Sequence, residues 1–490
     1  MQRTKSTTIN SFMKRLYLII LVAAGVITSG SSSAQEQAPR IFTLEECIAY
    51  ALENSSISKN SKLDEKIAES VVQETIGIGL PQINASATVM QNGKLPRFFS
   101  TYTGSDGFLG DLSGVPGIQV GDVVAAENFF QLKSSGDVGL SVSQLIFNGS
   151  YIVGLQASNA YKELSYKTTN LTREQIVQGV TKAYYAVLIN KERVTLFESN
   201  IGRVDTLLRN TRELFKNGFA ESIDADRIQV TLNNLIAERD KFVNLNELGI
   251  AVLKFQMNYP MSDSIVVSGN IQDVKIDVNL TAYRENWDYR SRPDYQVLDA
   301  NKRLQEYNVK NKYAVSLPSL GAFLNYGFST QSGDFAGLFK TNSNIDDAGG
   351  LGPDKWYNYS SYGLSLTMPI FTGLQNRQRV QQEKIKLQKI QNDFVGLKSS
   401  IDLEIKQSSL VYDNALKSLR IQQENIDLAG KVARVTKIKY EQGVGSNLEV
   451  VDAEDALRQA QTNFYTALFD AMIAKVDLDK AFGKLLIPQN

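Results

Sequence analysis

The sequence has 490 residues, with equal numbers of Lys plus Arg (52) and Asp plus Glu (52), so it carries no overall basic field for nucleic acid. It lacks histidine, the commonest general base and transition-metal ligand. The single cysteine, Cys47, can form no internal disulfide and is expected to be a small core residue. Without a P-loop, a His-Glu-x-x-His or a Gly-x-Ser-x-Gly motif, the sequence predicts no enzyme, no cofactor and no metal site.

The N-terminus has the pattern of a secretory signal peptide. The apolar core at 16–27 is too short to span the roughly 30 Å hydrocarbon layer of a bilayer. Small residues at Ser32-Ser33-Ala34 precede the expected cleavage point, so residues 1–34 are predicted to be removed. Cys47 lies too far along to carry a lipid anchor. The remaining chain has no apolar run long enough for a transmembrane helix, which leaves a soluble secreted protein or an outer-membrane β-barrel.

A first structural repeat is expected at residues 35–260. Thr43-Leu44-Glu45-Glu46 has the spacing of a capping box and predicts a helix that continues, after a break, to about Ile78. Apolar and polar residues then alternate, which predicts strands at about 82–94 and 134–147, separated by a long loop. Apolar residues recurring every seven positions predict a long helix at 150–217, and Gly218 ends it before a helix at 222–258. The heptad line is Val180, Val187, Val194, Ile201, Leu208 and Phe215.

The same order of elements recurs in a second structural repeat at residues 291–490. A helix from near Pro293 is followed by strands at about 318–330 and 358–371, a long helix at 375–442 and a helix at 446–483. Between the repeats, residues 261–290 form a mixed segment with short β-like runs. Two motifs repeat without a gap, which indicates an internal duplication. Gly139-Leu140-Ser141 matches Gly363-Leu364-Ser365, and Ile146-Phe147-Asn148-Gly149 matches Ile370-Phe371-Thr372-Gly373.

The four predicted strands have one apolar face and one small or polar face, and four strands are too few to close a barrel, which takes about eight. An open sheet edge in a bilayer would leave backbone groups unpaired, at several kcal/mol each. The pattern therefore predicts an α+β membrane protein whose four strands need partner strands from other chains; three chains would give twelve strands, the barrel that the resemblance described below implies. The long coiled-coil helices would leave the membrane together as a sheath.

The chain resembles the TolC-like outer-membrane efflux proteins, also called outer membrane factors, over essentially its whole mature length. The resemblance lies in the strand-to-helix signatures Leu145–Gly149 and Pro369–Gly373 and in the turn Tyr440-Glu441-Gln442-Gly443, which leads to Leu448–Ala453. It implies a homotrimer in the cell outer membrane, in contact with outer-membrane lipid, whose helices form an α-barrel extending into the periplasm. The segment 261–290 would form an equatorial belt.

The resemblance also implies a function as the exit duct of a tripartite efflux or type I secretion system. Such a duct passively conducts substrates delivered by a periplasmic adaptor (membrane fusion) protein and an inner-membrane RND or ABC transporter. The alternative is a secreted coiled-coil structural or adhesin protein, against which the four alternating strands count.

Two turns between long helices are expected to lie at the periplasmic tip and, by resemblance, to dock to the adaptor. Their glycines are equally the residues that any helix end favours. The docking residues are Asn217, Gly218, Phe219, Gln442, Gly443 and Val444.

Four residues near these turns are candidates for an iris-like gate. The resemblance implies a hydrogen bond between Asp224 and Tyr440 that helps to hold the entrance shut, although both residues also suit an ordinary first-turn acid and a packing aromatic. Glu449 and Asp452 share a helix face and form either a lumen-facing acidic ring or simple N-terminal acids favoured by the helix dipole. Gly445 stands where the family's best-known members have an arginine, and Arg227 is a candidate substitute.

Overall fold

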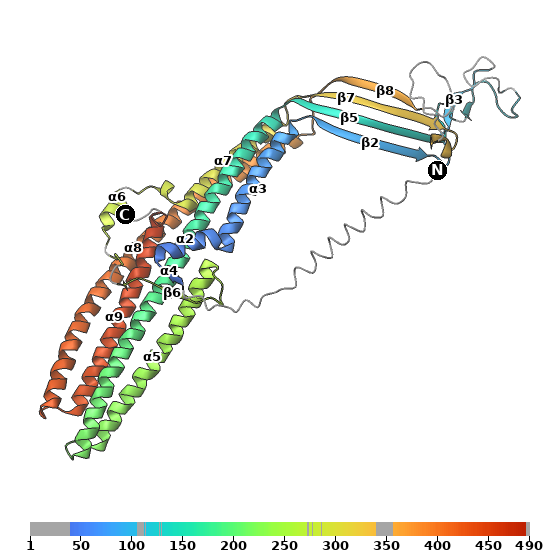
Figure 1. Cartoon of the computed structure of the whole chain (residues 1–490). Coiled ribbons are helices and arrows are strands. Elements are labelled where there is room, and N and C mark those ends of the chain that lie inside the picture. Colours follow the sequence, from blue (N-terminus) through green and yellow to red (C-terminus); the bar gives the residue numbers. More distant parts are fainter. Residues whose placement is uncertain are drawn as a thin grey trace, which may run out of the picture. The chain divides into compact units, whose positions relative to one another are not determined.

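The computed structural model describes residues 40–104, 112, 114–126, 128, 130–271, 274–276, 278–285, 287–339 and 356–486 (Figure 1). The expected signal peptide at 1–34 lies outside these residues. The chain folds into two compact units, each assembled from three stretches of sequence. Unit 1 comprises residues 1–54, 179–275 and 421–469, and unit 2 comprises 55–178, 276–420 and 470–490.

Unit 2 contains a four-stranded antiparallel sheet in the order β2-β5-β7-β8 (Figure 1). The strands are β2 (Gln82–Gln91), β5 (Ser134–Asn148), β7 (Ser319–Ser332) and β8 (Tyr357–Thr367). Strands β5 and β7 pair with each other, so the two halves of the duplication meet at the centre of the sheet. Within this sheet, β2 and β8 are the two edges and each is hydrogen-bonded on one side only.

The register of the sheet separates apolar from polar residues. One row across the four strands consists of Ile83, Val142, Leu324 and Tyr362, and the adjacent row on the opposite face consists of Asn84, Ser141, Asn325 and Ser361. Because successive side chains of a strand point to opposite faces, the sheet has one apolar and one polar face. Phe323, the exception on the polar face, lies over Gly363, where an added Cβ would come within 2.9 Å of its ring.

Two features of the strands differ from expectation. Strand β8 ends at Thr367, before the expected residue 371, because Pro369 has no N–H to donate to the ladder. The segment expected to be a long loop contains a short antiparallel hairpin, formed by β3 (Phe98–Thr101) and β4 (Val123–Ala126). Four-residue strands without clear alternation leave little periodic signal in a sequence.

The helices account for most of the described chain. Three of them contribute residues to both units: α4 (Gly149–Lys216), α8 (Gln375–Glu441) and α9 (Asn447–Ala481). Unit 1 also holds α2 (Leu44–Asn54), α5 (Ser222–Met257) and the parallel pair β1 (Arg40–Phe42) and β6 (Ile265–Val267). Unit 2 also holds α3 (Ser56–Ile78), α6 (Leu280–Glu285), η2 (Tyr289–Ser291), α7 (Pro293–Ala314) and η3 (Ala336–Phe339).

Within the described ranges, no helix is both long enough and apolar enough to cross a membrane.

The start of α2 forms by local hydrogen bonds that its sequence encodes. The Thr43 N–H donates to Glu46 Oε2 at 2.8 Å, and the Glu46 N–H donates to Thr43 Oγ1 at 3.3 Å, which is the reciprocal capping box. Cys47 on the same helix is fully buried, and burial raises the pKa of its thiol to about 12. The thiol is therefore a packed core group with little nucleophilic character, as expected from the sequence.

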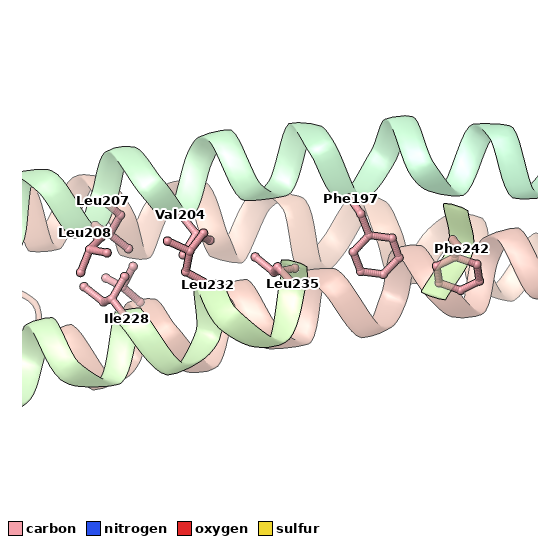
Figure 2. Close-up of a cluster of buried hydrophobic side chains, with 9 residues drawn as sticks. Phe197, Val204, Leu207, Leu208, Ile228, Leu232, Leu235 and Phe242 are labelled. Carbon is pink, nitrogen blue, oxygen red and sulfur yellow. The ribbon is translucent and has the colours of Figure 1, made fainter. Parts of the chain in front are cut away.

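The core of unit 1 is a seam between α4 and α5. Residues of α4 point toward residues of α5 along the two helices (Figure 2). The rings of Phe197 and Phe242 stack at 5.4 Å between centroids. Val450 of α9 joins the same cluster, whose other members are Val204, Leu207, Leu208, Ile228, Leu232 and Leu235. Burying such side chains contributes about 1.5–3 kcal/mol each, so this apolar seam is a main source of stability in unit 1.

Helix α9 carries a line of small residues that permits close helix packing. Ala453, Ala460, Ala467, Ala474 and Ala481 are spaced by seven and are all buried. In unit 1, Ala453 and Leu457 pack against Ala433 of α8. In unit 2, Ala471, Ala474 and Leu478 pack with Tyr412 of α8. A side chain no larger than a methyl group lets two helix backbones approach closely, and this explains the alanine spacing.

Unit 2 has a buried ionic centre around Arg292, the N-cap of α7. The guanidinium donates two hydrogen bonds to Asp294, at 2.7 and 3.1 Å, and pairs with Glu404 of α8 at 2.8 Å. It also donates to the backbone carbonyls of Lys480 and Ala481, at 3.3 and 3.2 Å. These carbonyls belong to the last turn of α9, where a helix has acceptors without intrahelical donors. Arg292 therefore joins α7, α8 and the C-terminus of α9.

Glu174 of α4 lies beside this centre and is a third carboxyl group next to two cations and two acids. Its side chain is 1% exposed, and among the described residues its Oε1 has no hydrogen-bond partner. Arg292 and Lys480 already face two acids, Asp294 and Glu404, so an ionised Glu174 would leave a net negative charge in a buried place. Burial raises the pKa of Glu174 to about 7, and the attraction of Arg292 offsets only part of this effect.

The raised pKa of Glu174 predicts a pH-dependent stability. The folded protein binds this proton more tightly than the unfolded chain, so the contribution is present below the ordinary pKa of 4.5 and is lost as pH rises to about 7. We expect the free energy of unfolding to fall over this range by up to about 3 kcal/mol relative to the Glu174→Gln variant. Urea unfolding of both proteins between pH 4.5 and 8 measures the difference. Parallel pH profiles would contradict the prediction.

Candidate functional site

The candidate site lies in unit 1, where two tight turns join the long helices. Gly218 and Gly443 adopt left-handed backbone conformations, with φ of 77° and 75°. The Phe219 N–H donates to the Leu214 carbonyl at 2.9 Å, and the Val444 N–H donates to the Lys439 carbonyl at 3.0 Å. Both turns therefore end their helices by the same six-to-one hydrogen bond, and only glycine adopts the required φ without strain.

Each turn presents one large apolar side chain to solvent. Phe219 is 82% exposed and Val444 is 79% exposed, and each directly follows the left-handed glycine. The flanking residues Asn217 and Gln442 are also exposed. Apolar side chains held out on rigid turns suit contact with another protein, so the six turn residues stay candidates for docking.

Asp224 and Tyr440 do not form the hydrogen bond that the resemblance implied. The Tyr440 hydroxyl lies 3.2 Å from the hydroxyl of Thr211, a fully buried residue of α4. Asp224 instead accepts the N–H of Glu221, at 3.2 Å, as the acid of the first turn of α5. Its carboxylate is thus used by its own helix N-terminus, with Glu221 and not Ser222 as the N-cap. Arg227 approaches Asp224 only to 4.0 Å, as a partly exposed pair of little energetic weight.

Asn447, the first residue of α9, makes a contact with α5 that the sequence analysis did not predict. Its Nδ2 donates to the backbone carbonyl of Asp224 at 2.9 Å, so it links the starts of α9 and α5. The side chain is 5% exposed, and in the described part of the chain its Oδ1 has no hydrogen-bond partner. The duplication offered a signal, because Asn447 follows Gly443 at the same distance as Ser222 follows Gly218. We call the Tyr440–Thr211 and Asn447–Asp224 contacts the latch.

Glu449 and Asp452 are exposed, in agreement with a shared outward face on the first turns of α9. The Glu449 N–H donates to Ser446 Oγ at 3.2 Å, so Ser446 supplies the cap of the helix. Neither carboxylate has an ion-pair or hydrogen-bond partner among the residues described. Both acids are therefore free to act on solvent ions, and their role as a ring stays a prediction. Across the described chain, no group of three or more Asp, Glu, Cys or His side chains is placed to hold a metal ion.

The chain thus combines a four-stranded antiparallel sheet with very long helices and tight glycine turns. Residues 290–484 match the family model described as outer membrane efflux protein. Outer membrane protein TolC of Vibrio cholerae is 20% identical over 71% of this chain and 76% of the relative. Alkaline protease secretion protein AprF of Pseudomonas aeruginosa is 20% identical over 68% of this chain and 67% of the relative.

Solved structures show the same fold. The MtrE outer membrane channel of Neisseria gonorrhoeae, in its open state, superposes with a TM-score of 0.65 at 18% identity, and the match covers 90% of this chain and 89% of that chain. These matches support the resemblance to the TolC-like outer-membrane efflux proteins that the sequence indicates, and with it a location in the outer membrane.

The latch can be tested through amide hydrogen exchange. Asn447→Ala leaves the Asp224 carbonyl without its donor, which costs about 1 kcal/mol. We expect roughly fivefold faster exchange of peptides covering the starts of α5 and α9. Ser222→Ala is the matched control, because Ser222 is the repeat counterpart of Asn447 and is exposed. Exchange that is unchanged in Asn447→Ala, or equally faster in Ser222→Ala, would show that the contact does not hold the two helix starts together.

Proposed function

We propose that the chain forms a homotrimeric exit duct of a tripartite efflux or type I secretion system. The observation that carries the proposal is the sheet in unit 2, which has an apolar face, a polar face and two edges bonded on one side only. In a bilayer such edges are stable only when they pair with further strands. Three copies supply twelve strands, enough to close a barrel around a polar lumen.

The exposed residues of the sheet support a lipid-facing surface. Ile83 on β2 and Tyr362, Leu364 and Leu366 on β8 are strongly exposed in the single chain. They lie on the edge strands, where a neighbouring copy and outer-membrane lipid would cover them. The alternative, a secreted coiled-coil structural or adhesin protein, gives no reason for an exposed apolar sheet face.

The turns of unit 1 form the proposed adaptor-docking tip and entrance. Phe219 and Val444 would contact a periplasmic adaptor protein, and the latch would hold the two helix pairs of each protomer together at an iris-like gate. Asp224, Tyr440, Glu449 and Asp452 belong to this proposed gate, with Tyr440 acting through Thr211. Delivery by an inner-membrane RND or ABC transporter is in keeping with relatives named for secretion, such as AprF.

The proposed duct is tested by measuring the mass of the protein and its conductance on the same sample. We expect the full-length protein extracted in detergent to have the mass of three chains and to give small, discrete, cation-preferring steps in planar bilayers. A barrel of twelve strands closes only in the trimer, so both properties are required together. A water-soluble monomer or dimer without conductance would instead support the coiled-coil structural protein.

The acidic pair predicts ion block from the periplasmic side. Replacement of Glu449 and Asp452 by Ala removes two carboxylates from each protomer, so block of the channel by a trivalent cation should weaken at least tenfold, at about 1.4 kcal/mol. Glu424→Ala with Asp427→Ala on α8 is a control of equal charge change. Block that persists unchanged in the Glu449 and Asp452 variant would leave these acids as helix-start residues only.

A further inference from the structure

Unit 2 contains a groove of about 530 Å³ that none of the proposed duct functions uses. Its walls come from α6, from Trp287, from α8 and from Phe482 just beyond α9. The apolar part of the lining consists of Leu280, Trp287, Ile405, Leu410 and Phe482. Grooves of roughly 300–1,000 Å³ with mainly apolar walls are the usual sites of small-molecule ligands.

The wall opposite α8 is fastened in place by hydrogen bonds. The Tyr412 hydroxyl donates to the Ile276 carbonyl at 2.7 Å and accepts the Val278 N–H at 2.9 Å. The Tyr283 hydroxyl donates to Asp479 Oδ1 at 2.6 Å. Tyr412 is a residue of α8, and Tyr283 of α6 is hydrogen-bonded to Asp479 of α9. These bonds hold the walls in place, so the groove is already formed and a ligand would not have to order it.

The charges that line the groove are unevenly paired. Of the two acids, Asp402 accepts a hydrogen bond from Tyr289 at 2.7 Å, and Asp413 pairs with Lys417 at 2.6 Å. The two cations, Arg284 and Lys406, line the same groove, and among the described residues neither has an ion-pair or hydrogen-bond partner. The groove therefore offers two unused positive charges.

Two further donors in the lining are also unused. Ser409 is 6% exposed, and in the described structure its Oγ has no hydrogen-bond partner. The Nε1 of Trp287 is likewise buried without a partner in that part of the chain. Buried polar atoms are nearly always hydrogen-bonded in native proteins, so two orphan donors beside one groove indicate a missing acceptor.

We propose that this groove binds a small amphipathic anion, a carboxylate, sulfonate or sulfate ester on an apolar body. The acidic group lies toward Arg284 and Lys406, and the body lies against Ile405, Leu410 and Phe482. Small shifts of Ser409 and Trp287 supply the remaining hydrogen bonds. A cation would meet two unpaired positive charges, and an uncharged apolar molecule would leave both the charges and the donors unsatisfied. The site does not depend on whether the chain conducts.

The probe is 8-anilinonaphthalene-1-sulfonate, an amphipathic anion that accepts energy from tryptophan. The chain has two tryptophans, so Trp356→Phe leaves Trp287 in the groove as the only donor. The full-length variant is titrated in lipid nanodiscs, with empty nanodiscs subtracted. We expect saturable energy transfer from Trp287 that weakens as salt is raised, because the acidic group is held by charge.

The matched variants separate a built site from general attraction. Arg284→Gln with Lys406→Gln should weaken binding about tenfold or more, because two charge-assisted contacts are lost. Arg379→Gln with Lys389→Gln changes two exposed cations of α8 outside the groove and should leave binding unchanged. Ser409→Ala should weaken binding a few-fold. All substituted cations are exposed, so equal thermal midpoints will show that the variants fold.

Several results would overturn the proposal. Energy transfer that does not saturate, or that falls equally in both double variants, would mean that the probe reports only surface charge. A density map of the trimer with a side chain of a neighbouring copy filling the groove would assign the space to subunit contact. Competition by an acidic peptide, with no effect of simple amphipathic anions, would assign the groove to a protein partner instead.

Discussion

The two unpaired edges of the sheet in unit 2 are the constraint on which the function of this chain depends. Strands β2 and β8 each leave a row of backbone donors and acceptors, and the faces between them are sorted into apolar and polar rows. In water such edges invite association, and in lipid they have to be closed. The proposed multichain barrel would pair these edges, so the proposal rests on backbone hydrogen bonding as well as on the relatives.

The duplication produces two similar helical hairpins in unit 1, α4 with α5 and α8 with α9, which differ in the contacts that they make in the latch. Both turns use a left-handed glycine and place an apolar residue after it. The first residue of the second helix differs between the two hairpins. Ser222, which begins α5, is exposed, whereas Asn447, which begins α9, is buried and donates to the Asp224 carbonyl. A backbone carbonyl is an acceptor whatever the side chain, so the contact survives changes at position 224 but depends on the amide at 447.

Local signals in the sequence were sufficient for the long helices, for the four strands of the sheet and for the turn geometry. The capping box at Thr43 and the glycines at 218 and 443 act through neighbouring residues and are found where the pattern indicates, whereas β8 ends earlier than expected and β3 and β4 left no clear pattern. The partners of Tyr440 and Asp224 were not predictable in this way. Tyr440 reaches a threonine 229 positions away, and Asp224 is taken by its own helix start. Which of two competing hydrogen bonds forms depends on tertiary distances that spacing alone does not encode.

The two interfaces of α4 in unit 1 differ in kind, and this bears on how the tip would open. Toward α5, α4 presents apolar side chains, whose exposure would cost about 25 cal/mol per Å². Toward α9, α4 makes three polar contacts: Arg193 with Thr466, Asn200 with Gln461, and Arg203 with Glu454, at 2.9, 2.8 and 3.2 Å. Water can replace polar partners of this kind, so the net contribution is about 0.5–1.5 kcal/mol for the neutral pair and about 1.5–3 kcal/mol for each hydrogen bond of an arginine. Val450 is the α9 residue within the apolar cluster. A duct that opens at this tip would therefore separate α9 from α4 at less cost than α5 from α4.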